Sequence, residues 1–129
     1  MSELPWKLVI AGQATILETQ KRDGTWVRTP VSAVQDHGVA YFVTDSLSGK
    51  VKRIRNFPVV RVAASTYRGV PTGEFDAATA RPLEGAERQA ALRAIRRAHP
   101  VIFGVIMRVR DWIRRTDGAC FELSDLRPV

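Results

Sequence analysis

Residues 48–56, with the sequence SGKVKRIRN, are the part of the chain whose composition points most directly to chemistry. Four cations occur within six residues: Lys50, Lys52, Arg53 and Arg55. Cationic side chains and the backbone N–H groups at a helix start both bind phosphate and carboxylate groups, so the segment is a candidate anion-binding helix. A solvated basic surface helix has the same composition and is the alternative. The segment is not a P-loop, because Thr44 stands at the first glycine position and Val51 replaces the residue that holds magnesium.

A second group of cations lies further along the chain. It comprises Arg108, Arg110, Arg114 and Arg115. Such a patch could bind a membrane surface or nucleic acid, but a solvated helix face is the commoner reason for it. No aromatic residue interleaves with the basic residues of 50–55, so stacking of single-stranded bases has little support. Nucleic acid is therefore a runner-up and not the expected partner.

Histidine and cysteine residues offer little for metal binding or nucleophilic catalysis. The chain holds only His37, His99 and Cys120, which form no spaced set of zinc ligands and no internal disulfide. Cys120 lies in an apolar, strand-like context and is expected to be a packed thiol. We predict no metal site, and no side chain is assigned a catalytic role.

Size and charge limit the class of protein. With 129 residues and 45% hydrophobic content, residues 1–129 are expected to form a single domain with one core. The net charge of +7 and the pI near 10.5 favour an anionic partner such as nucleic acid, phospholipid or a phosphorylated cofactor. No export signal is visible, and the longest apolar stretch, residues 101–107, is shorter than the roughly 20 residues that cross a bilayer. We expect a soluble, cytoplasmic protein without a membrane span.

The pattern of apolar and turn residues predicts mainly β structure around these candidates. An Asp23-Gly24 turn joins two predicted strands, residues 13–20 and 25–34, into a hairpin. The Asp36-His37-Gly38 turn follows. Further strands are predicted at residues 39–44, 59–66, 74–80 and 119–123.

Four helices are predicted at the periphery. They cover residues 5–11, 48–56 and 84–98, and a stretch that starts at Pro100 and extends through residue 113. In residues 48–56, Ser48 is expected to cap the helix while Val51 and Ile54 face inward. Six strands joined mostly by local hairpins indicate an α+β, mainly β fold, arranged as a meander around a small antiparallel barrel.

Several segments, taken in order, resemble the pyridoxamine 5′-phosphate oxidase-like, F420-dependent oxidoreductases. They are the KRDG turn at 21–24, Thr29-Pro30-Val31, the strand end at 41–44, the basic segment 48–56 with Pro58, and the RGVPTG loop at 68–73. The resemblance continues through Ala80-Arg81 and the late helices, so it covers nearly the whole chain. It implies a six-stranded antiparallel split β-barrel of the FMN-binding type, with two cofactor sites at the interface of a homodimer.

The same resemblance assigns cofactor-binding roles by position. Thr29, Pro30 and Val31 would lie along the tricyclic ring, and Thr44 and Ser48 near the phosphate-bearing linker. Lys50, Lys52, Arg53 and Arg55 would surround the phosphate and the acidic tail. Members often carry an aromatic residue just after the Thr-Pro-Val segment, where this chain has Ser32-Ala33.

The implied function is that of an enzyme, an oxidoreductase that transfers a hydride between coenzyme F420 and an unidentified small organic substrate. Such an enzyme needs few catalytic side chains, because the cofactor carries the hydride and the protein supplies position, charge and a dry pocket. An FMN-dependent enzyme of the same fold and a non-catalytic cofactor- or anion-binding module are the alternatives. A homodimer is also expected because sheet edges and the apolar face of residues 101–113 need covering.

Overall fold

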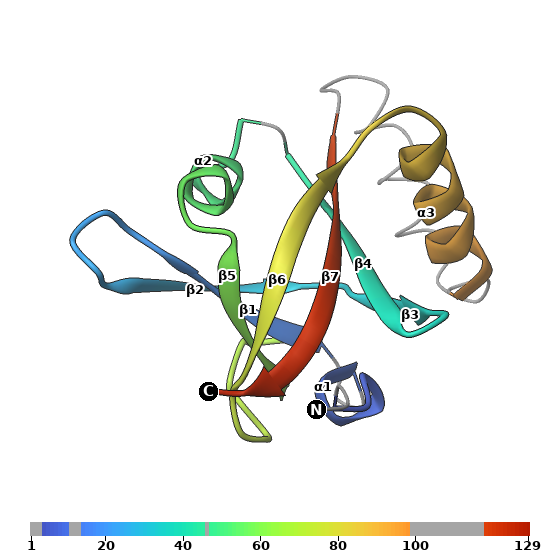
Figure 1. The fold of residues 1–129 in the computed structure, drawn as a ribbon. Coiled ribbons are helices and arrows are strands. Elements are labelled where there is room, and N and C mark those ends of the chain that lie inside the picture. The colour runs from blue at the N-terminus through green and yellow to red at the C-terminus, as the bar shows by residue number, and fades with distance from the viewer. Residues whose placement is uncertain (1–3, 11–13, 46, 99–117) are drawn as a thin grey trace.

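The computed structural model describes residues 4–10, 14–45, 47–98 and 118–129. These residues form three helices and seven strands (Figure 1). The helices are α1 (Lys7–Ile10), α2 (Gly49–Asn56) and α3 (Gly85–Ala98). The strands are β1 (Ala14–Gln20), β2 (Trp26–Val31), β3 (Val34–Asp36), β4 (Val39–Thr44), β5 (Val59–Ser65), β6 (Asp76–Leu83) and β7 (Ala119–Pro128).

All seven strands belong to one antiparallel sheet with the order β2-β1-β5-β6-β7-β4-β3. In the described part of the chain, β2 and β3 are the two edges and do not pair with each other. The sheet is strongly coiled, so that β1 and β2 run at a steep angle to β6 and β7 in Figure 1. The expected α+β, mainly β class is confirmed. The expected six-stranded barrel is wrong in strand number and in closure, since the sheet has seven strands and is open.

The additional strand arises where residues 25–34 were expected to form one strand. The chain leaves the ladder with β1 after Val31, passes through Ser32 and the buried Ala33, and starts β3 at Val34. β3 then pairs with β4 through the His37-Gly38 turn. Gly38 has a φ of 83°, which glycine adopts without steric cost. Because of this two-residue break, the segment predicted as one strand contributes to β2 at one edge of the sheet and to β3 at the other.

The predicted meander is also wrong, because two strands have neighbours that are distant in the sequence. β1 pairs with β2 as predicted, but its other neighbour is β5. β4 pairs with β3 and with β7. Helix α2 follows β4 and precedes β5, and it carries the chain from one side of the sheet to the other (Figure 1). Hairpin signals depend on residues that are close in the sequence, so they do not predict this crossover.

The main core lies on the concave face of the sheet. Strand β4 alternates, with Ala40, Phe42 and Thr44 buried, and its register partner β7 places Phe121 opposite Phe42. The two rings stack with centroids 5.3 Å apart and an interplanar angle of 17°. Val51 and Ile54 of α2 join this core, as predicted from their spacing. Burying these apolar side chains is the main favourable contribution to folding, at about 25 cal/mol per Å².

Helix α3 covers the opposite face of β4 and β7. There Leu83, Ala91 and Cys120 form a second buried cluster with Tyr41 and Val43 packed against it. Cys120 is thus a packed thiol, as predicted, and burial raises its pKa to about 11. Strands β6 and β7 extend further than predicted, to Leu83 and Pro128, because the two pair with each other along most of their length.

Some sequence-based predictions fall outside the described residues. They are His99, the helix expected from Pro100 through residue 113, and the cations Arg108, Arg110, Arg114 and Arg115. The helix predicted at 5–11 is shorter, at Lys7–Ile10, and inserts Val9 into the core beside Trp6. Among the described helices, none has the length and apolar character needed to cross a membrane.

Candidate anion-binding site at helix α2

Helix α2 occupies the residues predicted for the basic helix, from Gly49 to Asn56, with Ser48 at the N-cap. The Ser48 backbone has the extended conformation of an N-cap, with φ −69° and ψ 150°, but its side chain makes no capping hydrogen bond. Ser48 therefore occupies the predicted N-cap position but does not cap the helix through its side chain. Its Oγ is instead buried without a hydrogen-bond partner. A buried hydroxyl without a partner is uncommon, and its presence at a helix start raises the question of what group it serves.

Arg53 is held firmly on the side of α2 that faces β1. Its Nε donates a hydrogen bond of 2.7 Å to Oγ1 of Thr19, a residue with no solvent exposure. Its guanidinium lies over Gly49, because a Cβ added at Gly49 would be 2.6 Å from Nη1 of Arg53. The absence of a side chain at Gly49 thus makes room for the guanidinium at the helix N-terminus, where the helix dipole already favours an anion.

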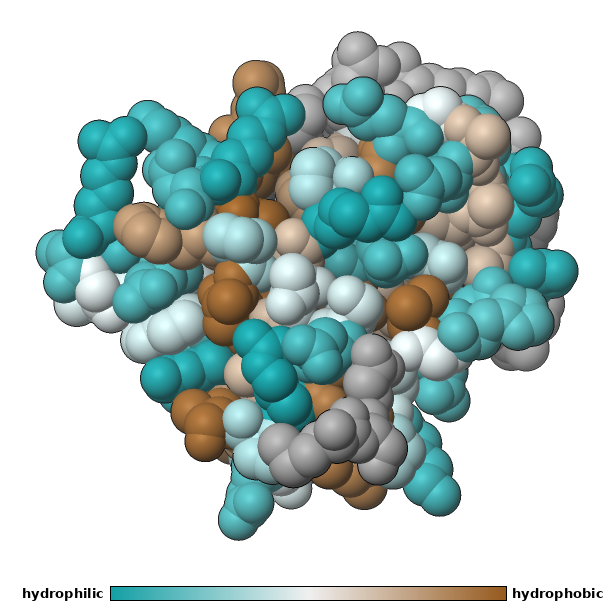
Figure 2. Space-filling model, viewed as in Figure 1, coloured by the Kyte–Doolittle hydropathy of each residue, from teal (hydrophilic) through white to brown (hydrophobic). Residues whose placement is uncertain are grey.

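The hairpin between β1 and β2 provides the opposite wall. Gly24, with φ 89°, completes the tight turn, and Asp23 accepts hydrogen bonds from the backbone N and Oγ1 of Thr25, which lower the pKa of the Asp23 carboxyl. The turn thereby presents Lys21 and Arg22 beside α2. In Figure 2 the hairpin tip and α2 form a hydrophilic rim on the left of the molecule.

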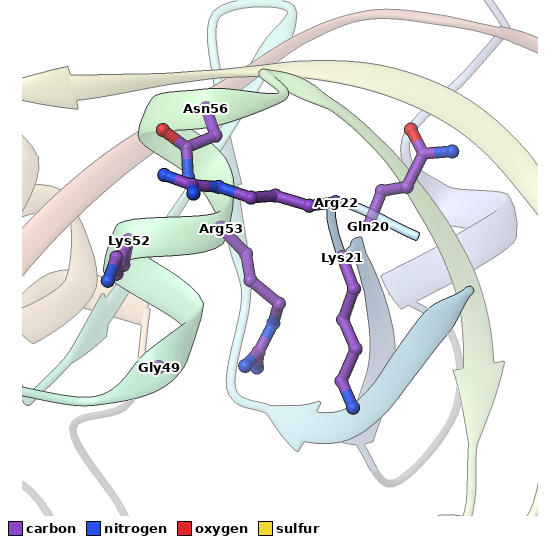
Figure 3. Close-up of a pocket in the computed structure, with 7 residues that line it drawn as sticks. All are labelled: Gln20, Lys21, Arg22, Gly49, Lys52, Arg53 and Asn56. Carbon is purple, nitrogen blue, oxygen red and sulfur yellow. The ribbon is translucent and has the colours of Figure 1, made fainter. Parts of the chain in front are cut away.

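A cavity of about 300 Å³ lies between the hairpin and α2. Its lining residues are Gln20, Lys21, Arg22, Gly49, Lys52, Arg53 and Asn56 (Figure 3). Four of these seven residues are cations and none is acidic. In Figure 3, Lys21 and Arg53 extend in the same direction between the two walls, while Arg22 reaches across toward Asn56. The chemistry of this lining suits phosphate or several carboxylates.

Lys50 directly follows Gly49, which lines this cavity, but Lys50 is not itself a lining residue. Burial lowers the pKa of its ammonium group, and repulsion from Arg53 lowers it further, while Asp45 acts in the opposite direction. The protonated form of Lys50 therefore lacks full compensation in the free protein. A bound anion near Lys50 would stabilise that form.

The segment Thr29-Pro30-Val31 lies on the edge strand β2 with its side chains on alternate faces. Thr29 is opposite Leu17 and Val31 opposite Thr15 in the ladder with β1, so both share the face of the buried Leu17, while Pro30 is exposed. Oγ1 of Thr29 is buried and has no hydrogen-bond partner. Within the described residues, Thr29 and Ser48 are the only ones with such an orphaned buried side-chain atom.

The structure brings together only part of the predicted set. Lys52 and Arg53 line the cavity beside the hairpin, whereas Arg55 lines a different cavity on the other side of α2. Thr44 is buried at the end of β4. Neither of these two cavities is lined by the remaining predicted residues, which are Thr29, Pro30, Val31, Thr44, Ser48 and Lys50.

Sequence reasoning missed the contribution of the hairpin tip to the site. Gln20, Lys21 and Arg22 lie about thirty residues before α2, and only the packing of α2 on β1 makes them neighbours. The available signal was the pair of adjacent cations at a predicted turn. It could not indicate which other cations they would face.

The comparisons with known proteins give likenesses of fold. No family model matches the sequence, and no curated protein matches it. A solved structure of HutZ, the heme storage protein from Vibrio cholerae, matches with a TM-score of 0.65 and 13% identity over 91% of this chain and 82% of that one. An F420-H2 dependent reductase matches with a TM-score of 0.58 and 18% identity over 87% of this chain and 94% of that one.

Two further structures extend the likeness. A putative pyridoxamine 5′-phosphate oxidase from Listeria innocua matches with a TM-score of 0.58 and 13% identity over 90% of this chain and 86% of that one. A structure described as a domain-swapped dimer matches with a TM-score of 0.63 and 18% identity over 87% of this chain and 80% of that one. The chain therefore has the fold of the pyridoxamine 5′-phosphate oxidase-like class, and the resemblance expected from its sequence is confirmed at the level of the fold.

Proposed function

We propose that this protein is an oxidoreductase that binds the deazaflavin cofactor F420 and transfers a hydride between it and a small organic substrate. The observation that carries the proposal is the cavity between α2 and the β1–β2 hairpin, which has four cations and no acid in its lining. This cavity occurs in a fold shared with an F420-H2 dependent reductase. Fold alone does not assign a function, so the proposal depends on the chemistry of the site.

The residues present fit a phosphorylated cofactor with further acidic groups. Arg53 is oriented by Thr19 and needs the space left by Gly49, as a preformed anion-binding group would. The buried hydroxyls of Thr29 and Ser48 have no hydrogen-bond partner within the described residues, so a cofactor group that reached them would satisfy them. An unsatisfied buried polar group costs about 1–3 kcal/mol, so a ligand that pairs with it gains affinity.

In the proposed reaction the bound cofactor supplies the hydride chemistry, and the chain supplies binding and orientation. Lys50 and Arg53 would hold the phosphate, and Lys21, Arg22 and Lys52 would hold the acidic tail. The β2 segment from Thr29 to Val31 would hold the ring system and orient it by backbone and hydroxyl contacts. No residue of the chain is assigned as the proton donor.

The number of cations favours F420 over FMN, which is the alternative cofactor. A single phosphate is fully neutralised by about two cations, because it carries a charge of about −1.5 to −2 at neutral pH. The cavity lining provides four cations, with Lys50 nearby. The excess of positive charge suits a cofactor whose phosphate is followed by a tail of carboxylates.

Heme binding has less support in the described residues, although HutZ shares the fold. Neither described cavity is lined by His, Met or Tyr, the usual neutral or phenolate axial ligands. Cys120 lines one cavity, but its pKa of about 11 disfavours the thiolate form that binds iron. We therefore prefer a flavin-type cofactor to heme for this protein.

A homodimer forms part of the proposal. Within the described residues the sheet has two free edges, β2 and β3, and exposed edges are commonly covered by a second chain. β2 carries the segment proposed to contact the ring, so a partner on this edge would complete the cofactor site. Light scattering should give about twice the chain mass of 14.4 kDa, and a monomer at micromolar concentration would rule out an interfacial site.

The experiment that tests the cofactor is parallel titration of the purified protein with F420, FMN and hemin, followed by calorimetry or fluorescence. We expect F420 to bind most tightly and Lys50→Ala to weaken it by roughly ten- to a hundredfold, the cost of one charge-assisted contact. The control is Arg97→Ala, which removes an equal charge from an exposed position on α3. Tight binding of FMN alone would change the cofactor, and binding of none of the three would refute the proposal.

Catalysis needs its own measurement, because a non-catalytic module would also bind F420. Reduced F420 should be oxidised in the presence of protein and a panel of small enones, quinones and nitro compounds, with absorbance of the oxidised deazaflavin as the readout. Loss of turnover in Lys50→Ala at subsaturating cofactor is expected. Tight F420 binding with no turnover of any acceptor would favour the module.

A further inference from the structure

A second cavity, of about 340 Å³, lies on the other side of α2 from the cation-lined one. Its walls come from Val51 and Arg55 of α2, from residues 82–84 at the end of β6, from Arg88 of α3 and from residues 118–121 at the start of β7. Helix α2 therefore separates two cavities, with Lys52 and Arg53 on one side and Val51 and Arg55 on the other.

The floor of this second cavity is apolar. Leu83, Cys120 and Phe121 are all buried, and Val51 is 5% exposed. The Cys120 thiol stays protonated at neutral pH, since burial raises its pKa to about 11. The floor thus adds an uncharged, polarisable surface, against which a hydrocarbon or aromatic group gains affinity by leaving water.

The rim of the cavity is charged and mostly cationic. Arg88 is oriented by a 3.0 Å hydrogen bond from its Nη2 to the carbonyl oxygen of Gly118. Arg55 is exposed, and within the described residues neither guanidinium forms a salt bridge with a carboxylate. Glu84 is the one acidic residue among the lining residues described, so the two arginines leave the rim with an excess of positive charge.

We propose that this second cavity binds a small organic carboxylate with an apolar body, whose carboxylate pairs with Arg55 and whose body contacts Leu83, Cys120 and Phe121. Arg is the side chain best suited to a carboxylate, because its planar guanidinium can donate two parallel hydrogen bonds. The volume falls at the small end of the range for ligand pockets, about 300–1,000 Å³. This site is distinct from the proposed cofactor site and does not depend on the identity of the cofactor.

The charge and the apolar floor together define the ligand class. Inorganic phosphate would pair with the arginines but would gain nothing from Leu83 and Phe121. A neutral aromatic alcohol would occupy the floor but would leave Arg55 without a partner. An organic acid satisfies both parts of the cavity.

The test uses 4-phenylbutyrate, with 4-phenylbutanol and inorganic phosphate as comparison probes, on the protein of residues 1–129. We expect 4-phenylbutyrate to bind up to about fivefold more tightly than the alcohol, the upper range for a partly exposed ion pair. Arg55→Gln should abolish this preference, and the exposed, charge-matched control Arg93→Gln on α3 should retain it. Thermal unfolding of each variant verifies that it is folded.

Cys120 provides an independent readout, because it is the only cysteine of the chain and lies on the cavity floor. Saturating 4-phenylbutyrate should slow its modification by a thiol reagent in the parent protein and in Arg93→Gln. Equal affinity for the acid and the alcohol, an unchanged preference in Arg55→Gln, or equally tight competition by phosphate would overturn the proposal. Displacement of 4-phenylbutyrate by FMN or F420 would also overturn it, because the two sites would then be one.

Discussion

Gly49→Ala separates the role of α2 in anion binding from its role in stability. Gly49 lies in the first turn of the helix, and the added Cβ would be 2.6 Å from Nη1 of Arg53, closer than non-bonded atoms approach. The atom that must move is Nη1, at the far end of the flexible Arg53 side chain. The backbone of α2 and the hydrogen bond from Arg53 Nε to Thr19 can stay in place. We therefore expect the guanidinium to shift while the fold is preserved.

The expected effects on stability and on binding have opposite signs. Replacing glycine by alanine where the backbone allows it raises the free energy of unfolding by about 0.4–1 kcal/mol. Losing the aligned guanidinium contact to a phosphate costs about 1.5–3 kcal/mol of binding free energy. Because Arg53 is only half buried, we expect the lower end, close to tenfold in the dissociation constant.

The assays are chemical unfolding for stability and calorimetric titration with F420 and FMN for affinity. Gly73→Ala is the matched control, since its Cβ would make an ordinary 3.9 Å contact with the Cβ of Ala64 in a loop that lines neither described cavity. Parental affinity in Gly49→Ala would refute the proposed position of Arg53 at the anion. A large loss of stability would refute the reasoning that only a side-chain end has to move.

Three further predictions concern charge, pH and the core. The pKa of Lys50 is lowered in the free protein, and a bound phosphate should raise it. The affinity for F420 or FMN should therefore be complete below the lowered pKa and fall as pH rises through it, by at most about tenfold per pH unit. Calorimetry in buffers of different ionisation enthalpy should detect the proton uptake on binding, and Lys50→Gln should remove this uptake. Arg22→Gln at the exposed hairpin tip should weaken F420 more than FMN, and an equal effect on the two cofactors would contradict tail recognition. Phe42→Ala should lower the free energy of unfolding by about 3–5 kcal/mol in denaturant melts, because it removes the partner of the Phe121 ring from a site without solvent exposure. The exposed Leu47→Ala should change stability by less than about 0.5 kcal/mol.

Features set by neighbouring residues could be predicted from the sequence. The Asp23-Gly24 turn formed because Asp23 bonds Thr25 and Gly24 takes a positive φ, both of which depend on residues within the turn. Helix α2 begins after Ser48 and presents Val51 and Ile54 to the core, as their spacing indicates. The fold was predicted from the resemblance over the whole chain, because no single segment is specific for it.

Features set by long-range packing could not be predicted in the same way. β5 pairs with β1 across more than forty residues, and no hairpin signal reports such a pairing. The sequence predicts a continuous strand through the break after Val31, because Ser32 and Ala33 carry no strong turn signal. The contribution of Lys21 and Arg22 to the cavity follows from that packing and was missed for the same reason.

The distribution of satisfied and unsatisfied polar groups supports a functional role for α2 independently of any relative. Away from α2, several charged groups are paired: Glu18 bonds Arg28, and Arg81 joins Glu87 and Glu122. Around α2, Lys50 is half buried with a lowered pKa, the Ser48 hydroxyl lacks a partner, and Lys52 and Arg53 face further cations across a cavity without an acid.

These features cost free energy in the free protein, because desolvated or mutually repelling charges are not compensated within the described residues. Sequences that fold well tend to break local rules mainly where a ligand or a reaction requires it. An anion placed between α2 and the hairpin would offset the repulsion between Lys50 and Arg53 and would favour the charged form of Lys50. The same groups that weaken the free protein would then stabilise the complex, so saturating F420 should raise the unfolding temperature of the parent more than that of Lys50→Ala.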